Sequence, residues 1–373
     1  RQAKGFDNQV LQPKLHDCHE QQLFLGHKVK NSGMTLACGI AHQFETECPY
    51  SWQSECSEHS GRVEYRIYDK PCQPIQLFKY AAYHSSHSAP VKKLQSRTGW
   101  SLSRAMKDGF RTLLAGQRNY LDDFWQRSDV QVDPHPDQEQ SPMGEFQQAL
   151  RGNLFQILQA SGRAEGASIP AKGLTGQTYE GHYFWDTEIY VLPFLTYTTP
   201  HIARTLLRFR HSMLDQARQR AKELNLKGAL FPWRTINGEE ASAYYAAGTA
   251  QVHINADIMY ALRKYVEVTD DKALLFNEGA EMLVETARLW HDLGFYSERN
   301  NGQFCIHGVT GPDEYTTVVN NNAYTNLMAR GNRCRDAAKA PGTFCHLGTP
   351  HRSRSCRDRR LATGRRPNVY PLR

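Results

Sequence analysis

Between Glu145 and Arg330 the chain carries one helical segment after another, and this succession limits the folds open to it. Apolar residues recur there at intervals of three to four residues, and Gly, Asn or Pro marks many of the segment boundaries. The predicted helices span residues 145–160, 184–196, 200–224, 242–268, 272–292 and 315–330. Long amphipathic helices arranged as hairpins, with functional loops at one end, favour an α/α toroid.

The residues before this helical array have a different pattern. Arg62–Tyr68 alternates polar and apolar side chains and Ile75–Tyr83 is rich in aromatic residues, so residues 1–90 predict a β-sandwich or a part of one. Residues 101–130 have helical spacing, and Val132–Asp137 contains two prolines that end the helix. We therefore predict a mixed, multidomain chain, with a partial β-sandwich over residues 1–95, a helical linker over 96–143, and an incomplete helical toroid over 144–330.

The net charge of +7 is a property of the last part of the sequence. Residues 331–373 contain 11 basic and 2 acidic residues, a net +9, so the rest of the chain carries −2. This basic tail has no helical period and no apolar pattern from which a core would form. We expect it to be a non-native segment, produced by a shift of reading frame near Arg330. A role in binding RNA is the alternative, but no specific nucleic-acid partner is predicted.

Nine cysteines are scattered through the chain without the spacing of a metal site, so no metal ligand is predicted. We expect them to be reduced, as in a cytoplasmic protein. The sequence has no apolar run near 18 residues and no N-terminal signal, so a membrane partner is not expected. The first residue is Arg1 and not Met, which we interpret as a sign of a fragment.

The stretch Gly311–Tyr315 is the first candidate for catalysis. Gly308, Gly311 and Pro312 indicate a loop before a helix, and Glu314 lies in that loop. A carboxyl group held there and aimed into a cavity has the geometry that a general acid needs. The alternative is that Asp313 and Glu314 only cap the helix that follows.

A second stretch, Gly173–Glu188, concentrates three glycines, four aromatic residues and three acids. Proteins commonly hold sugars with an aromatic ring against the sugar face and a carboxylate on its hydroxyl groups. A buried aromatic cluster beside a tight turn explains Tyr183 and Phe184 equally well. It explains Asp186 and Glu188 less well, because buried acids are costly unless they are paired.

These stretches, together with Gly228–Arg234 and Gly238–Glu240, resemble glycoside hydrolase family 65, which includes maltose, kojibiose, nigerose and trehalose phosphorylases. The resemblance is dense from Gln147 to Arg330 and weaker before that. It implies an N-terminal super-sandwich and an (α/α)6 barrel, of which this chain supplies about half. The family's later Lys-Gln pair and its phosphate-binding loop have no counterpart here.

The resemblance implies inverting phosphorolysis of an α-glucosyl disaccharide, of the maltose or kojibiose type, to β-glucose 1-phosphate. Inorganic phosphate is then the co-substrate and attacks the sugar, and no cofactor is needed. Glu314 matches the family's general acid, and Trp185 and Asp186 match the residues that bind the glucosyl unit. Further candidates for lining the site are His182, Arg234, Glu239 and Glu240. Relatives are commonly dimers, so a homodimer is one arrangement the resemblance offers.

Other functions stay open at this point. A hydrolase related to trehalases needs a base carboxylate for water, for which Glu239 or Glu240 is the candidate. A catalytically inactive fragment that still binds carbohydrate fits the missing half. Arg234 has a structural ion pair as its alternative role, and His182 and His253 have partly buried structural roles as theirs.

Overall fold

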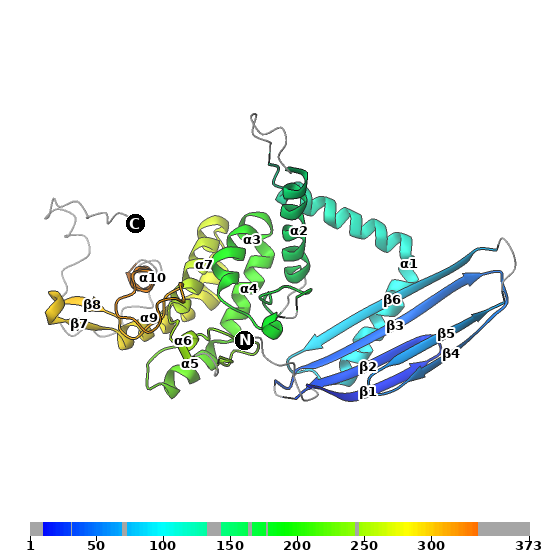
Figure 1. Ribbon diagram of the computed structural model, residues 1–373, viewed down its shortest axis with the longest axis horizontal. Helices are drawn as coiled ribbons and strands as arrows, with labels where there is room; N and C mark the ends of the chain where they lie inside the picture. The colour runs from blue at the N-terminus through cyan, green and yellow to red at the C-terminus, as the bar shows by residue number, and fades with distance from the viewer. Residues whose placement is uncertain are drawn as a thin grey trace.

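The computed structural model describes residues 10–30, 32–68, 73–132, 143–162, 166–176, 178–242 and 246–334. An antiparallel sheet forms one end of the molecule, an array of helices forms the other, and the long helix α1 (Val91–Ser128) connects them (Figure 1). This confirms the predicted fold class of an N-terminal sheet domain followed by a helical region. The greater part of the predicted linker Val132–Asp137 and of the basic tail lies outside the described residues.

The sheet is built from consecutive antiparallel strands. Its strands are β1 (Leu11–His19), β2 (Gln22–Val29), β3 (Thr35–Thr46) and β6 (Ile75–Ser86), in the order β1-β2-β3-β6. Between β3 and β6 the chain forms a separate hairpin of β4 (Tyr50–Cys56) and β5 (Gly61–Ile67). The predicted strands over Arg62–Tyr68 and Ile75–Tyr83 correspond to β5 and β6.

The first half of α1 packs on this sheet, although its residues were assigned to the linker. Leu102 of α1 is buried in one cluster with Phe24 of β2 and Tyr80 of β6. Gly39 of β3 makes the close packing possible, since a Cβ atom there would lie 2.8 Å from the Thr98 side chain of the helix. Gly109 then interrupts the helix with φ 76° and ψ 158°, a conformation that only glycine adopts readily.

The second half of α1 leads to the helical array. Phe124, 1% exposed, packs there against Leu154 and Leu158 of α2. The longer helices are α2 (Met143–Ser161), α3 (Leu192–Thr198), α4 (Pro200–Ser212), α5 (Leu214–Glu223), α7 (Ile254–Thr269), α9 (Ala280–Leu293) and α10 (Ala323–Cys334). The largest core cluster joins residues of α3, α4, α7 and α9, including Leu195, Leu207, Ile258 and Met282. α10 packs against α7 and α9.

Short elements complete the array and connect its helices. They are η1 (Thr178–Gly181), the π-turns η2 (Thr187–Val191) and η3 (Leu275–Gly279), α6 (Ala246–Thr249), α8 (Lys272–Leu274), η4 (Glu298–Asn300), β7 (Phe295–Ser297) and β8 (Gln303–Cys305). The hairpin of β7 and β8 turns through Asn301 and Gly302, both with positive φ. Among the described residues, none of the helices is long and apolar enough to cross a membrane.

Several predicted helices have other boundaries in the structure. The helix predicted at 200–224 breaks at Met213, where φ is −95° and ψ is 2°, and the one predicted at 242–268 becomes α6 and α7, separated by a turn at Ala250–His253. The helix predicted at 315–330 begins only at Ala323, because Asn322 accepts a hydrogen bond from the Thr325 N–H and caps it. The same helix continues past Arg330, and Asn332 is buried against Thr286.

The expectation that all cysteines are reduced is wrong for one pair. Cys18 of β1 and Cys56 of β4 form a disulfide that joins the four-stranded sheet to the β4–β5 hairpin. Cys38, Cys48 and Cys305 are free thiols. The hairpin is therefore held to the sheet by a covalent bond.

We expect the double variant C18S/C56S to lower the free energy of unfolding by about 2–4 kcal/mol. The reason is that the unfolded chain is no longer restricted by a covalent link between two residues 38 positions apart. Thermal denaturation with and without a reductant measures this. The reductant should lower the melting temperature of the wild type and leave that of the double variant unchanged. A wild type insensitive to reductant would contradict the assignment of the disulfide.

Candidate active site

The loop that carries Glu314 is closed at its base by backbone and asparagine hydrogen bonds. Val309 and Val319 pair through two backbone hydrogen bonds of 3.0 and 2.8 Å. The side-chain oxygens of Asn320 and Asn321 accept the backbone N–H groups of Gly308 and Ile306, at 3.1 and 3.0 Å. These contacts fix the loop as a closed unit whose tip contains Glu314.

Glu314 does not cap a helix. The side chain of Asp313 accepts the backbone N–H of Tyr315 at 3.1 Å, so Asp313 forms the local turn. Glu314 is exposed, and its Oε1 accepts a hydrogen bond of 2.7 Å from Nε2 of Gln251. The backbone N–H of Thr310 also donates to the carbonyl of Ala250, at 3.0 Å. The loop Val309–Val319, which we call the acid loop, is thus anchored to the turn that precedes α7.

Trp185 is anchored to that same turn. Its partly buried indole meets the ring of His253 edge to face, with 5.0 Å between the ring centroids. Because Gln251 and His253 are two residues apart, Glu314 and Trp185 lie at one end of α7. Asp186, the neighbour of Trp185, is exposed at the start of the π-turn η2. The structure therefore brings these three predicted residues to one region.

His253 belongs to a buried polar chain. Its Nδ1 lies 2.6 Å from Oδ2 of Asp257, and both residues are fully buried. The hydroxyl of Tyr324 in α10 donates to the other oxygen of Asp257 at 2.8 Å. Burial, together with the negative charge of Asp257, raises the pKa of Tyr324. The tyrosine is therefore a permanent donor, and the chain Tyr324–Asp257–His253 holds the imidazole that supports Trp185.

The helix that follows Trp185 is held by a buried ion pair. Glu188 and Arg210 are each 1% exposed and form two hydrogen bonds, of 2.7 and 2.9 Å. Arg210 also donates to the carbonyl of Phe184 at 3.3 Å. The cost of burying Glu188 is thus offset by a paired guanidinium, and Glu188 is a structural acid.

The loop Gly228–Glu240 packs against the stretch that contains Trp185. Tyr183 and Thr235 exchange backbone hydrogen bonds of 2.8 and 3.2 Å, and Trp233 meets Phe184 edge to face at 5.2 Å. Gly228 has φ 85°, and a Cβ atom there would lie 2.1 Å from the carbonyl oxygen of Glu285 in α9. The glycine is therefore required for the loop to approach α9.

Glu240 fixes the shape of this loop from inside. Its two carboxylate oxygens accept the backbone N–H groups of Trp233 and Arg234 at 2.9 and 3.1 Å. Arg220 forms an ion pair with it at 2.5 Å. Glu239, in contrast, is exposed and accepts a hydrogen bond from the side chain of Asn237 at 3.0 Å. The carboxylate of Glu240 is thus occupied by its own loop.

Arg234 and His182 lie together with Glu180. Arg234 is 4% exposed, and its Nη2 donates to the carboxylate of Glu180. The same Nη2 lies 3.2 Å from Nδ1 of His182. Burial lowers the pKa of His182, and the charge of Arg234 acts in the same direction. This cluster links η1 to the loop Gly228–Glu240. Contact of either residue with a substrate stays a prediction.

The sequence indicated a structural role for His253, but its segment was not identified as the one on which these loops converge. Gln251, His253, Asn255 and Asp257 are all buried and alternate with the apolar residues between them. Asn255 accepts the N–H of Phe231 at 2.9 Å and donates to the carbonyl of Ala229 at 2.7 Å. The signal was present, since four polar side chains at alternate positions of an apolar segment require internal partners.

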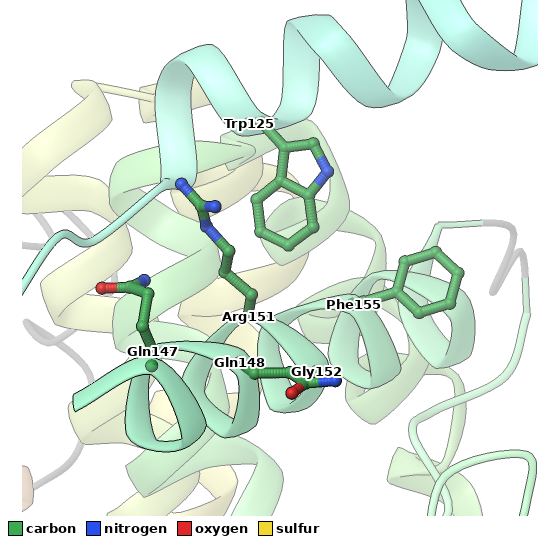
Figure 2. A pocket seen from close by; sticks show the side chains of 7 residues that line it. Trp125, Gln147, Gln148, Arg151, Gly152 and Phe155 are labelled. Carbon is green, nitrogen blue, oxygen red and sulfur yellow. The ribbon is translucent and has the colours of Figure 1, made fainter. Parts of the chain in front are cut away.

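An open groove of about 450 Å³ lies away from these residues, at the junction of α1 and α2. Figure 2 shows the indole of Trp125 over α2, beside Arg151 and Phe155. Arg151 is paired there with Asp129, and Gln147 bonds to the backbone of Val130. The groove contains none of the predicted site residues. Within the described ranges, no three His, Cys, Asp or Glu side chains are grouped to hold a metal ion.

Two family models match this chain. The model of the glycosyl hydrolase family 65 central catalytic domain matches residues 151–341, and that of the family's N-terminal domain matches residues 1–124. The first match covers the acid loop, the Trp185 stretch and the turn before α7. It also continues past Arg330, where the resemblance was expected to stop.

Individual relatives agree with these matches. An α,α-trehalose phosphorylase of Thermoanaerobacter brockii is 45% identical over 82% of this chain and 38% of the relative. A kojibiose phosphorylase of Halothermothrix orenii is 33% identical over 72% of this chain and 36% of the relative. The chain thus spans less than two fifths of the length of these curated relatives.

A solved structure also matches. A protein from the human microbiome, described as a candidate kojibiose phosphorylase, superimposes with a TM-score of 0.75 at 28% identity. The match covers 87% of this chain and 42% of that protein. It therefore includes both the sheet and the helical array.

We expect E188Q to lower the free energy of unfolding by about 3–5 kcal/mol, because it leaves the buried charge of Arg210 without its counter-charge. Urea denaturation measures the loss. In the double variant E188M/R210M much of the stability should return, since no buried charge is then left.

The matched control is D215N, which removes the exposed partner of Arg218 and should cost less than about 1 kcal/mol. A cost of E188Q no larger than that of D215N would contradict the assignment of the buried pair.

Proposed function

Because this chain belongs to glycosyl hydrolase family 65, we propose that it forms part of an enzyme that cleaves an α-glucosyl disaccharide by inverting phosphorolysis. The products are β-glucose 1-phosphate and the released sugar. The observation that carries the proposal is the convergence of Glu314 and Trp185 on the turn before α7, through Gln251 and His253. This convergence supports a site in which a general acid lies at the same end of α7 as an aromatic ring that binds sugar.

Glu314 is the general acid in this mechanism. The glycosidic bond breaks through a transition state with oxocarbenium character, and the leaving oxygen needs a proton. The exposed carboxyl of Glu314, with one oxygen held by Gln251, donates that proton from its other oxygen. Phosphate attacks the anomeric carbon from the opposite side, so the configuration inverts.

Of the two carboxylates considered as a base for hydrolysis, Glu240 is poorly suited to that role. Glu240 is bound to Arg220 and to two backbone N–H groups of its own loop. Those donors stabilise its ionised form and occupy the lone pairs that would take a proton from water. Glu239 is exposed and stays the candidate base for the alternative hydrolase. The occupied carboxylate of Glu240 supports phosphate over activated water as the nucleophile.

Trp185 and Asp186 bind the glucosyl unit in the proposal. The indole, supported from behind by His253, offers a rigid apolar face, and the neighbouring carboxylate accepts sugar hydroxyl groups. Arg234 and His182 hold the adjoining loop through Glu180. We assign Glu239 and Glu240 the same supporting role rather than direct contact with the sugar.

For the substrate we propose α,α-trehalose in place of the maltose or kojibiose type expected from the sequence. A trehalose phosphorylase is 45% identical to this chain, whereas a kojibiose phosphorylase is 33% identical. A second candidate function is carbohydrate binding without turnover. It needs only the Trp185 stretch, whose indole is held by His253, and not the acid at Glu314. The cytoplasmic location expected from the sequence stays a prediction, and the Cys18–Cys56 disulfide does not support it.

The test is to incubate the protein with trehalose, maltose, kojibiose and nigerose, with and without phosphate, and to measure β-glucose 1-phosphate. We expect phosphate-dependent product from trehalose, and a loss of about 100-fold or more in E314Q, because the proton donor is gone. Saccharide binding measured by calorimetry should survive in E314Q.

The exposed Glu298 supplies the control variant E298Q, which should keep full activity. Glucose released without phosphate would instead establish a hydrolase. Binding of a disaccharide with no turnover under any condition would establish the binding function.

A further inference from the structure

Gln251 is an unusual neighbour for an exposed acid, because it is itself 2% exposed. Its backbone N–H donates to the carbonyl of Gly248 at 3.1 Å, and the carbonyl of Ala250 receives the N–H of Thr310 at 3.0 Å. The side chain therefore leaves a fixed backbone inside the protein and reaches outward to Glu314. A buried side chain of this kind has already lost its rotamer freedom during folding.

The amide of Gln251 acts on only one oxygen of Glu314. Its Nε2 donates to Oε1 at 2.7 Å, whereas its own Oε1 is buried and has no hydrogen-bond partner in the described part of the chain. An amide nitrogen can only donate, so Oε1 of Glu314 is held as an acceptor. Oε2 is then the oxygen left to carry the proton when the carboxyl group is protonated.

We infer that Gln251 is a positioning residue that assigns Oε2 of Glu314 as the oxygen that delivers the proton to the leaving group. The inference rests on the proposed function and adds a second residue to it. A carboxyl group free to rotate presents its proton in several directions, and only one of them meets the glycosidic oxygen. The neutral amide removes that freedom without competing for the proton, because it does not titrate.

A purely structural role for Gln251, in which it only ties the acid loop to α7, predicts different kinetics. The backbone bond from Thr310 to Ala250 and the Val309–Val319 pair already tie that loop. If Gln251 is only a structural tie, its loss should lower kcat by the same factor for every substrate. Loss of proton positioning should affect only those leaving groups that need a proton.

The first experiment therefore compares leaving groups. Q251M removes the donor at similar volume and should lower kcat for the disaccharide by about 10-fold or more. With α-glucosyl fluoride, whose leaving group needs little protonation, its kcat should stay within about twofold of wild type. Equal losses on both substrates, or no loss on either, would overturn the inference.

The second experiment needs no turnover. In Q251E a second carboxylate lies against Glu314 and the two share a proton, so the Glu314 carboxyl should titrate about one pH unit higher or more. Carbon-13 NMR of labelled glutamate follows this, with the Glu314 signal identified by its absence in E314Q. The control is Q219E, since Gln219 donates to Glu223 at 2.9 Å on the exposed face of α5.

An unchanged Glu314 titration in Q251E would overturn the inference, because the two side chains would then not be in contact. A Glu314 titration that shifts equally in Q219E would overturn it too. Full activity of E314Q, in contrast, would refute the proposed function and leave the NMR comparison standing.

Discussion

The burial of four polar side chains at the start of α7 is the constraint on which the rest of the candidate site depends. Gln251, His253, Asn255 and Asp257 are between 0 and 2% exposed, and each unpaired polar atom in such a place costs about 1–3 kcal/mol. Gln251 and Asn255 have partners on the loops around them, and Asp257 has Tyr324 of α10. The loops are therefore held by this one segment in addition to their contacts with one another, such as the Tyr183–Thr235 pair.

This arrangement explains why stretches far apart in the sequence meet. The side chain of Asn255 forms hydrogen bonds with the backbone of Ala229 and Phe231, and Asp257 accepts one from Tyr324 of α10. Each contact is a hydrogen bond to a fully buried side chain of this segment, so a partner that moved away would leave that side chain unsatisfied. Because these polar side chains belong to one continuous segment, a shift of that segment would break its contacts with all of its partners together.

Much of the fold could be predicted from local patterns, because these patterns reflect local physics. Alternating residues predicted β5, aromatic richness predicted β6, and helical spacing predicted α2. The loop around Glu314 was also foreseen from Gly308, Gly311 and Pro312. The break at Met213 carries no glycine or proline signal, and Gly248 before the turn at Ala250–His253 was a signal that the sequence reasoning did not use. The Asn301-Gly302 turn was a signal that the sequence reasoning did not use.

The site residues divide in the same way. Glu314, Trp185 and Asp186 were found by residue type, but the roles of Glu240 and Glu188 could not be, since a carboxylate in a sequence does not reveal its partner. Glu240 is bound by backbone N–H groups and Glu188 by Arg210, 22 residues away in the chain. The disulfide of Cys18 and Cys56 was missed for a similar reason, because pairing depends on the register of strands.

The bend at Gly109 has a consequence for how the molecule loses its structure. The two halves of α1 are buried in different cores, one with Tyr80 of the sheet and one with Leu158 of α2. A continuous helix would transmit the unfolding of one core directly into the other along its backbone hydrogen bonds. The non-helical backbone at Gly109 interrupts the regular helix, so we expect the sheet and the helical array to have separate local stabilities and to open independently.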